Sequence, residues 1–305
     1  MPETSVSVRI AALGLFGAVL AMALPLACPD IRTPYFLGAR MFGGVAAACF
    51  VLALGARQAQ RPAASTTLWI FGATFLAYAA MELVYQRITL RLPLTGTSPA
   101  AVAFLGQVND YVLDRSYQYL AILALWLLLR QALSPTWTSR VRMGDPRHET
   151  TILGGDQPMT WSRVARRLTV MIALLAGAGA FLRLAGTFDG RTAALLGGRF
   201  LGGFNNSLIE EIVFRGLLLP AFLLPLGPTE ANWLQAGFFS IIHYSFIEEW
   251  ALMPVAIESS RLLFYLGIGW FLGRSTLDTG GIGISTYLHF LITAAIWTTL
   301  TLGGS

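Results

Sequence analysis

The stretch NNSLIEEIVFRGLLLPAFLLPL, residues 205–226, decides how this chain can fold. It is long enough to form a membrane-spanning helix, yet it places Glu210, Glu211 and Arg215 within an otherwise apolar run. An ionisable side chain at the centre of a bilayer costs about 2.5–3.5 kcal/mol to insert, so such residues are rare and usually functional. The question is whether this run lies in a membrane, and what its carboxylates do there.

The composition is that of a polytopic membrane protein. Of the 305 residues, 55% are hydrophobic and only 12% are charged, and the mean hydropathy is +0.62. A soluble domain carries about 25% charged residues, roughly twice this share. All 21 basic residues are arginines that gather in loops, so the net charge of +5 does not indicate nucleic-acid binding. The two cysteines are too few for a disulfide framework.

Apolar segments of spanning length recur along the chain and predict an all-α fold, a polytopic bundle of about eight to nine transmembrane helices. They lie near 10–28, 37–55, 67–85, 117–133, 168–186, 204–226, 232–247, 251–273 and 280–302. The run AAVAFLGQVNDYV, residues 100–112, is too short and polar to span, and we expect it to be re-entrant or interfacial. No internal repeat is evident, which argues against a transporter built from inverted repeats.

One long polar stretch, residues 134–167, divides the apolar chain and holds six of the arginines. The positive-inside tendency places it on the cytoplasmic side. We therefore expect N-terminal helices of unassigned role over 1–133, a basic loop over 134–167, and a membrane domain over 168–305 that holds the carboxylates. With the loop inside, Glu210 falls near the outer face of the membrane.

The two adjacent carboxylates have different surroundings on a helix. Glu211 and Arg215 are four residues apart on one face and can pair, whereas Glu210 is rotated by about 100°. Burial and the neighbouring negative charge favour proton binding by Glu210, which suits it to take a proton from water and later return it. The alternative is a structural ion-pair cluster that locks helices together.

Two of the three histidines, His243 and His289, lie in separate apolar segments downstream of the Glu-Glu run. A lone histidine on an apolar face is usually a core residue, but two of them after a Glu-Glu helix indicate a convergent site. Imidazole can share a water with Glu210, bind a metal, or donate to a developing oxyanion. Upstream of the carboxylates, Asn206 or Ser207 is the expected N-cap of the Glu-Glu helix.

At these residues the sequence resembles the CAAX-protease and bacteriocin-processing (CPBP) family, the type II CAAX prenyl endopeptidases. Three motifs carry the resemblance: E-E-x-x-x-R at 210–215, F-x-x-x-H at 239–243, and H-x-x-x-N at 289–293. Each is weak alone, but their order, spacing and placement on three membrane helices are together specific. The resemblance covers about 166–305, and the third motif departs from the family because Thr293 stands where Asn is usual.

The resemblance implies an intramembrane endopeptidase of helical fold. It implies these catalytic roles: water activation by Glu210 with His243, support from Glu211 and Arg215, and oxyanion stabilisation by His289 with Thr293. A Thr hydroxyl can donate as the Asn amide does, although its reach is shorter. Losing one such donor costs about 10²–10³ in rate.

The family has also been described as metalloproteases. If zinc is bound, Glu210, His243 and His289 are the expected ligands, since two His and one Glu form a known catalytic zinc set. The H-E-x-x-H signature of zinc proteases is absent, and we favour glutamate catalysis without a metal or other cofactor.

The expected partners are the lipid bilayer and a membrane-anchored or exported protein or peptide substrate, and the expected location is a bacterial inner membrane. Two other functions stay open. One is a catalytically silent immunity or scaffold protein, which Thr293 favours. The other is a proton-coupled transporter, in which Glu210 and the histidines relay protons.

Overall fold

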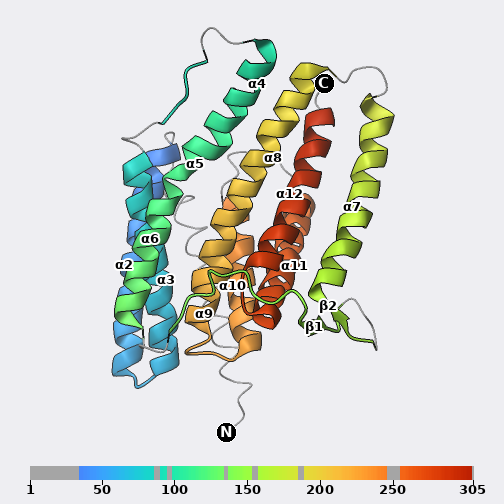
Figure 1. Cartoon of the computed structure of the whole chain (residues 1–305). Helices are drawn as coiled ribbons and strands as arrows, with labels where there is room; N and C mark the ends of the chain where they lie inside the picture. The colour runs from blue at the N-terminus through green and yellow to red at the C-terminus, as the bar shows by residue number, and fades with distance from the viewer. Residues whose placement is uncertain are drawn as a thin grey trace. The chain divides into compact units, whose positions relative to one another are not determined.

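The computed structural model describes residues 34–85, 90–94, 98–133, 137–152, 157–184, 189–245 and 255–303 (Figure 1). Their regular structure is helical apart from one two-stranded sheet, which confirms the predicted all-α class. The elements are α2 (Pro34–Gln58), α3 (Pro62–Tyr85), α4 (Pro99–Val108), η1 (Asn109–Leu113), α5 (Asp114–Ser116), α6 (Gln118–Ala132), β1 (Glu149–Thr150), β2 (Met159–Thr160), α7 (Trp161–Leu184), α8 (Gly190–Glu211), η2 (Ile212–Leu218), α9 (Leu219–Phe222), α10 (Pro228–Ser245), α11 (Val255–Thr279) and α12 (Gly283–Gly303). The predicted first span, residues 10–28, lies outside the described residues.

The chain divides into two compact units, each assembled from three segments. The first unit comprises Met1–Arg87, Ala121–Ser139 and Phe214–Arg274, and the second comprises Ile88–Leu120, Arg140–Val213 and Ser275–Ser305. In the first unit α2 packs along α3, as Figure 1 shows. The division by sequence into 1–133, 134–167 and 168–305 concerns the roles of these parts and stays a prediction.

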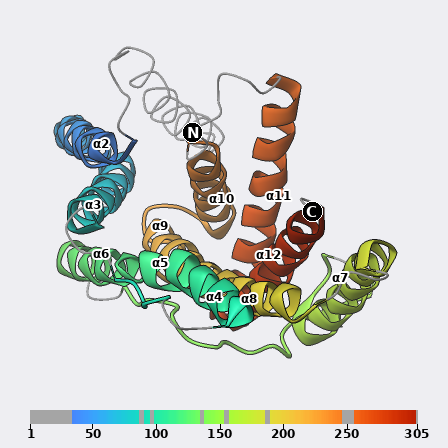
Figure 2. The ribbon, with the colours of Figure 1, turned by 90° about the horizontal axis from the view of Figure 1, so that it is seen from above.

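In the second unit, α8 packs against α4 and α12, and α12 packs in turn against α7 (Figures 1 and 2). A hydroxyl pair, Thr169 and Tyr287, joins α7 to α12 at 2.8 Å. The carboxylates lie at the C-terminal end of α8, where it continues into the π-helix η2. Single π turns within α-helices are frequent at functional sites.

Helix α8 begins earlier than the sequence suggested, so the predicted N-cap at Asn206 or Ser207 is wrong. Its N-cap is Asp189, whose side chain accepts a hydrogen bond from Thr192 N at 2.8 Å. That bond also lowers the pKa of the Asp189 carboxyl. Glycines are more frequent in membrane helices than in soluble ones, so those between Asp189 and Asn206 do not end α8.

Two of these glycines let α8 approach the preceding helices closely. A Cβ placed at Gly198 would lie 2.6 Å from the Cβ of Gln107, and one placed at Gly202 would overlap the Cβ of Tyr111. The two positions form a G-x-x-x-G pair, a spacing that lets helix backbones pack tightly without a hydrophobic driving force.

Residues 100–112 are not a separate short segment, as the sequence suggested; that they are re-entrant or interfacial stays a prediction. This segment is part of a helical run of 34 residues, Pro99–Ala132, which is one of two described stretches long and apolar enough to cross a membrane; the other is Pro62–Met81. The run tolerates Asn109 because that buried side chain bonds both backbone groups of Leu92, at 2.7 and 3.1 Å. The count of eight to nine spans is not confirmed and stays a prediction.

Part of the polar stretch holds the turn between α11 and α12. Arg140 donates to the carbonyls of Thr276 and Leu277 at 3.0 and 3.2 Å, and Arg142 donates to Gly280 O at 2.7 Å. Cations at a helix C-terminus are favourable. Burial, and then the charge of Arg142, lower the pKa of Arg140. Since α12 carries His289 and Thr293, these bonds help to fix where that helix starts.

Gly202→Ala should destabilise the protein by about 1–3 kcal/mol, because its Cβ would force α8 and η1 apart. Gly197→Ala is the matched control on the same helix, since a Cβ there meets only Phe104 ring carbons at 3.8 and 3.9 Å. The control should be neutral or stabilising, because Ala favours helix over Gly by about 1 kcal/mol. Thermal unfolding in detergent measures both. Equal midpoints for the two variants would contradict the close approach.

Candidate functional site

In the second unit the imidazole of His289 lies between the two adjacent carboxylates. Its Nδ1 is 2.9 Å from Glu211 Oε1, and its Nε2 is 3.6 Å from Glu210 Oε2. The Glu211 side chain is fully buried, and those of His289 and Glu210 are 7% and 15% exposed. A buried carboxylate needs such a partner, because desolvating an uncompensated charge is costly.

Glu210 has a second polar neighbour one turn earlier on its own helix. Asn206 Nδ2 donates to Glu210 Oε1 at 2.9 Å, and the Oδ1 of the same amide accepts a hydrogen bond from Arg115 Nη1. Sequence reasoning missed Arg115, because nothing in residues 1–165 could be assigned a role. The polar run QVNDYVLDR, residues 107–115, was the available signal.

Thr293 lies one turn after His289 on α12 and contacts a buried hydroxyl of α8. Ser207 Oγ donates to Thr293 Oγ1 at 3.4 Å, and Ser207 is fully buried. Since Thr293 Oγ1 accepts this bond, its own O–H is oriented to donate elsewhere. Thr293 can thus act as a hydrogen-bond donor, which is the capacity that the usual Asn provides.

In the first unit, the motif residue Arg215 is fully buried among α10 and α11. Its Nη2 donates to Gly269 O at 3.1 Å, and its guanidinium carbon lies 4.3 Å from the centre of the Phe239 ring. Gln235 donates to the same carbonyl at 2.9 Å. The arginine therefore combines a hydrogen bond with a cation–π contact, which is worth about 2 kcal/mol or more when desolvated.

His243 lies one helical turn after Phe239 on α10. Its Nδ1 is 2.7 Å from Phe239 O, and its ring stacks on Tyr265 with centroids 4.2 Å apart. A carbonyl only accepts, so Nδ1 carries the proton in this bond, and neutral His243 then has its lone pair on Nε2. The Phe of the F-x-x-x-H motif thus serves twice, through its carbonyl to His243 and through its ring to Arg215.

The second unit thus brings together four of the six predicted site residues: Glu210, Glu211, His289 and Thr293. The other two, Arg215 and His243, belong to the first unit. The predicted Glu211–Arg215 pair and the sharing of a water by Glu210 and His243 stay predictions.

Among the described residues, no three His, Cys, Asp or Glu side chains form a cluster with the geometry of a metal site. Glu210 Oε2 and His289 Nε2 are nevertheless 3.6 Å apart, close to the roughly 3.3 Å that separates two ligands of a tetrahedral zinc. This pair fits two of the three predicted ligands, and His243, the third, belongs to the first unit.

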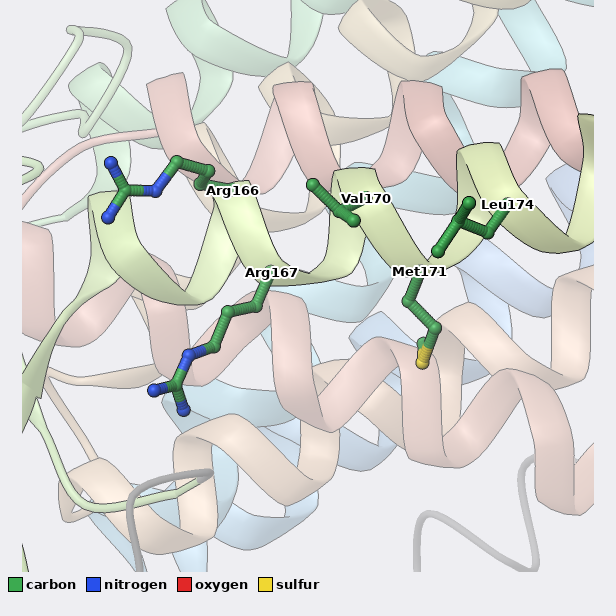
Figure 3. Close-up of a pocket in the computed structure, with 5 residues that line it drawn as sticks. All are labelled: Arg166, Arg167, Val170, Met171 and Leu174. Carbon is green, nitrogen blue, oxygen red and sulfur yellow. The ribbon is translucent and has the colours of Figure 1, made fainter.

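A pocket of about 430 Å³ is lined by residues of α7. Figure 3 shows its lining residues: Arg166, Arg167, Val170, Met171 and Leu174. No residue of the three motifs lines it. Arginines followed by exposed apolar side chains along one face are typical of a helix that enters a bilayer from a basic loop.

Comparison with known proteins points to the same part of the chain. Residues 192–295 match the family model described as type II CAAX prenyl endopeptidase Rce1-like. No curated protein and no solved structure matches the chain. The matched region spans the residues from Glu210 to Thr293 and therefore contains all three motifs. Residues 192–295 are thus similar to the Rce1-like type II CAAX prenyl endopeptidases, which confirms the family resemblance that the motifs predicted.

Proposed function

We propose that this chain is an intramembrane endopeptidase that hydrolyses a peptide bond in a membrane-anchored or exported protein or peptide. The observation that carries the proposal is the His289 imidazole held between Glu210 and Glu211, within the region that matches the Rce1-like model. A carboxylate next to an oriented imidazole in a buried site is suited to proton transfer. A structural ion-pair cluster would not explain why the remaining motif residues are also present.

In the proposed reaction, Glu210 takes a proton from a water, and the oxygen of that water bonds to the scissile carbonyl carbon. The carbonyl π electrons move to its oxygen, which accepts hydrogen bonds from His289 and Thr293. The carbon–nitrogen bond then breaks, and Glu210 gives its proton to the leaving nitrogen. His243, with its lone pair on Nε2, shares the attacking water.

Glu211 has a different task from its neighbour. Its fully buried carboxylate accepts from His289 Nδ1 and thereby fixes the orientation of the ring. An imidazolium held in this way would donate from both nitrogens, one to Glu211 and one toward the reacting oxygen. This is the role of the orienting carboxylate in other catalytic triads. Arg215 supports the site by electrostatic attraction to its carboxylates.

The proposed substrate and location follow from the surroundings of the site. Peptide hydrolysis needs water, so the site must open to an aqueous cavity, and a substrate must expose its backbone there. With the basic loop on the cytoplasmic side of a bacterial inner membrane, Glu210 lies toward the opposite face. A membrane-anchored or exported protein is therefore the proposed substrate.

Glu210→Gln should abolish cleavage, because the amide cannot accept and return a proton. The matched control is Glu230→Gln, at an exposed position in the first turn of α10. Equal amounts of wild type and of the two variants are expressed in membranes of the native host. Mass spectrometry of all protein N- and C-termini then compares them. Termini present with wild type and the control, but lost with Glu210→Gln, identify substrates.

Identical termini in all three strains would favour the catalytically silent immunity or scaffold protein. Proton flux that Glu210→Gln abolishes, without any change in termini, would favour the transporter.

Thr293→Val should lower kcat by about 10²–10³ if its hydroxyl donates to the oxyanion. Thr298→Val is the matched control on α12, since that hydroxyl donates to Ala294 O at 2.7 Å within its own helix. Initial cleavage rates of a substrate found above measure both. A Thr293→Val variant as active as the control would exclude the proposed donor role.

Removal of metal ions should leave cleavage unchanged if Glu210 acts without zinc. Purified protein is treated with 1,10-phenanthroline and, as the control, with the non-chelating 1,7-isomer, and cleavage rates are compared. Loss with the chelator alone, restored by added zinc, would instead support the site of Glu210, His243 and His289. Bound zinc would then polarise the scissile carbonyl and lower the pKa of a bound water.

A further inference from the structure

The segment Asn109–Tyr119 holds α8 just before the carboxylates. Tyr119 donates from its hydroxyl to Asn205 Oδ1 at 2.9 Å, and Asn205 Nδ2 donates to the carbonyl of Tyr111 at 3.3 Å. The neighbouring Asn206 accepts from Arg115. Two consecutive amides of α8 are thus bonded to a part of the chain that the family match, residues 192–295, does not include.

The bond between Arg115 and Asn206 is connected to Glu210, the proposed catalytic carboxylate, by a second hydrogen bond. Arg115 Nη1 donates to Asn206 Oδ1, Asn206 Nδ2 donates to Glu210 Oε1 at 2.9 Å, and Glu210 Oε2 lies 3.6 Å from His289 Nε2. All four side chains belong to the second unit. Arg115 therefore reaches Glu210 through one intervening amide.

The guanidinium of Arg115 determines the direction of the hydrogen bonds from Arg115 through Asn206 to Glu210. A guanidinium has only donors, so the amide of Asn206 must turn its oxygen to Arg115 and its NH₂ to Glu210. Ionised Glu210 accepts that N–H on Oε1, which directs Oε2 toward His289. If Arg115 were absent, the amide oxygen of Asn206 would lose this donor, and its NH₂ would hold Glu210 Oε1 less firmly in place.

We infer that Arg115 is a positioning residue for Glu210, and that it acts through Asn206 by fixing which carboxylate oxygen faces His289. The inference rests on the proposed function of Glu210 as the group that activates water. It assigns to the helical run Pro99–Ala132 a part in the site that none of the three motifs contains. A displacement of a catalytic group by about 1 Å can cost 10²-fold in rate, so this orientation has consequences for turnover.

A second arginine, Arg199, serves as a control that distinguishes positioning of Glu210 from helix packing alone. Arg199 Nε donates to Gln107 Oε1 at 3.0 Å and so joins α8 to α4, about two turns before Asn206. It is an arginine–amide bond between α8 and the same helical run. Arg199→Met thus removes a comparable packing contact and should leave kcat unchanged.

The first test compares the kinetics of five variants with wild type on a substrate cleaved by wild type but not by Glu210→Gln. Arg115→Met and Asn206→Ala should each lower kcat about tenfold to a hundredfold with KM unchanged, and the double variant should lose no more than either. Arg115→Lys should recover part of the rate, because the ammonium still donates to Asn206 Oδ1. Three results would overturn the inference: a raised KM with kcat kept, losses that multiply in the double variant, or an equal loss in Arg199→Met.

A second test needs no cleavage. Thermal unfolding in detergent is measured for Arg115→Met, Glu210→Ala and their double variant. Coupling through Asn206 predicts that the two single shifts in midpoint do not add in the double variant, whereas Arg199→Met with Glu210→Ala should add. Additive shifts in both pairs would overturn the inference. Non-additive shifts in a protein without any cleavage would overturn the proposed function and keep the Arg115–Glu210 linkage.

Discussion

The hydrogen bond between Glu211 and His289 is the interaction on which the arrangement of the second unit depends. The Glu211 carboxylate has no exposed surface and lies 2.9 Å from His289 Nδ1, and breaking such a buried pair costs about 3–5 kcal/mol. It joins α8 to α12, two helices far apart in the sequence. The same contact directs the other nitrogen of the ring toward Glu210. The Glu211–His289 bond therefore joins two helices and also orients the imidazole next to Glu210.

Close packing of α8 on α4 and η1 brings polar side chains of these segments within hydrogen-bonding distance of each other. Gly198 and Gly202 let α4 and η1 lie directly on α8, and the short side chains of Asn205 and Asn206 can then bond to Tyr111 and Arg115. With larger residues at the glycines, the helices would be too far apart for direct bonds. Small residues at the interface and polar residues between the backbones are complementary features of membrane helix packing.

The sequence alone was sufficient for the class of fold, and it singled out Glu210, Glu211 and His289, which lie close together. Apolar runs of spanning length predicted the helices, and the Glu-Glu pair with His289 predicted the residues that the second unit brings together. Helix boundaries were less certain, because glycines at 197–203 and polar residues at 107–115 resemble breaks. Their roles depend on the partner segment that each meets, as Gly202 does with Tyr111 and Asn109 with Leu92. Such information is not contained in local periodicity.

For the same reason Arg115 could not be found from the motifs. Its bond to Asn206 spans 91 positions of the chain, and an arginine between two apolar segments is indistinguishable from one that reaches the membrane surface. Thr293 shows the converse. It departs from the family motif, yet its contact with Ser207 leaves it able to donate a hydrogen bond. Whether a residue can donate a hydrogen bond at a site therefore depends on its neighbours in the structure as well as on its identity.

The bonds from Arg140 to the end of α11 have a consequence for the biogenesis of the protein. Arg140 and Thr276 are separated by 136 positions. At about 5–20 residues per second, the ribosome reaches the acceptor roughly 7–27 s after the arginine has been made. During this interval Arg140 lacks these two acceptors, because α11 has not yet been synthesised. Docking of Arg140 would therefore mark a chain in which α11 is complete, and truncation before α11 would leave Arg140 without these bonds.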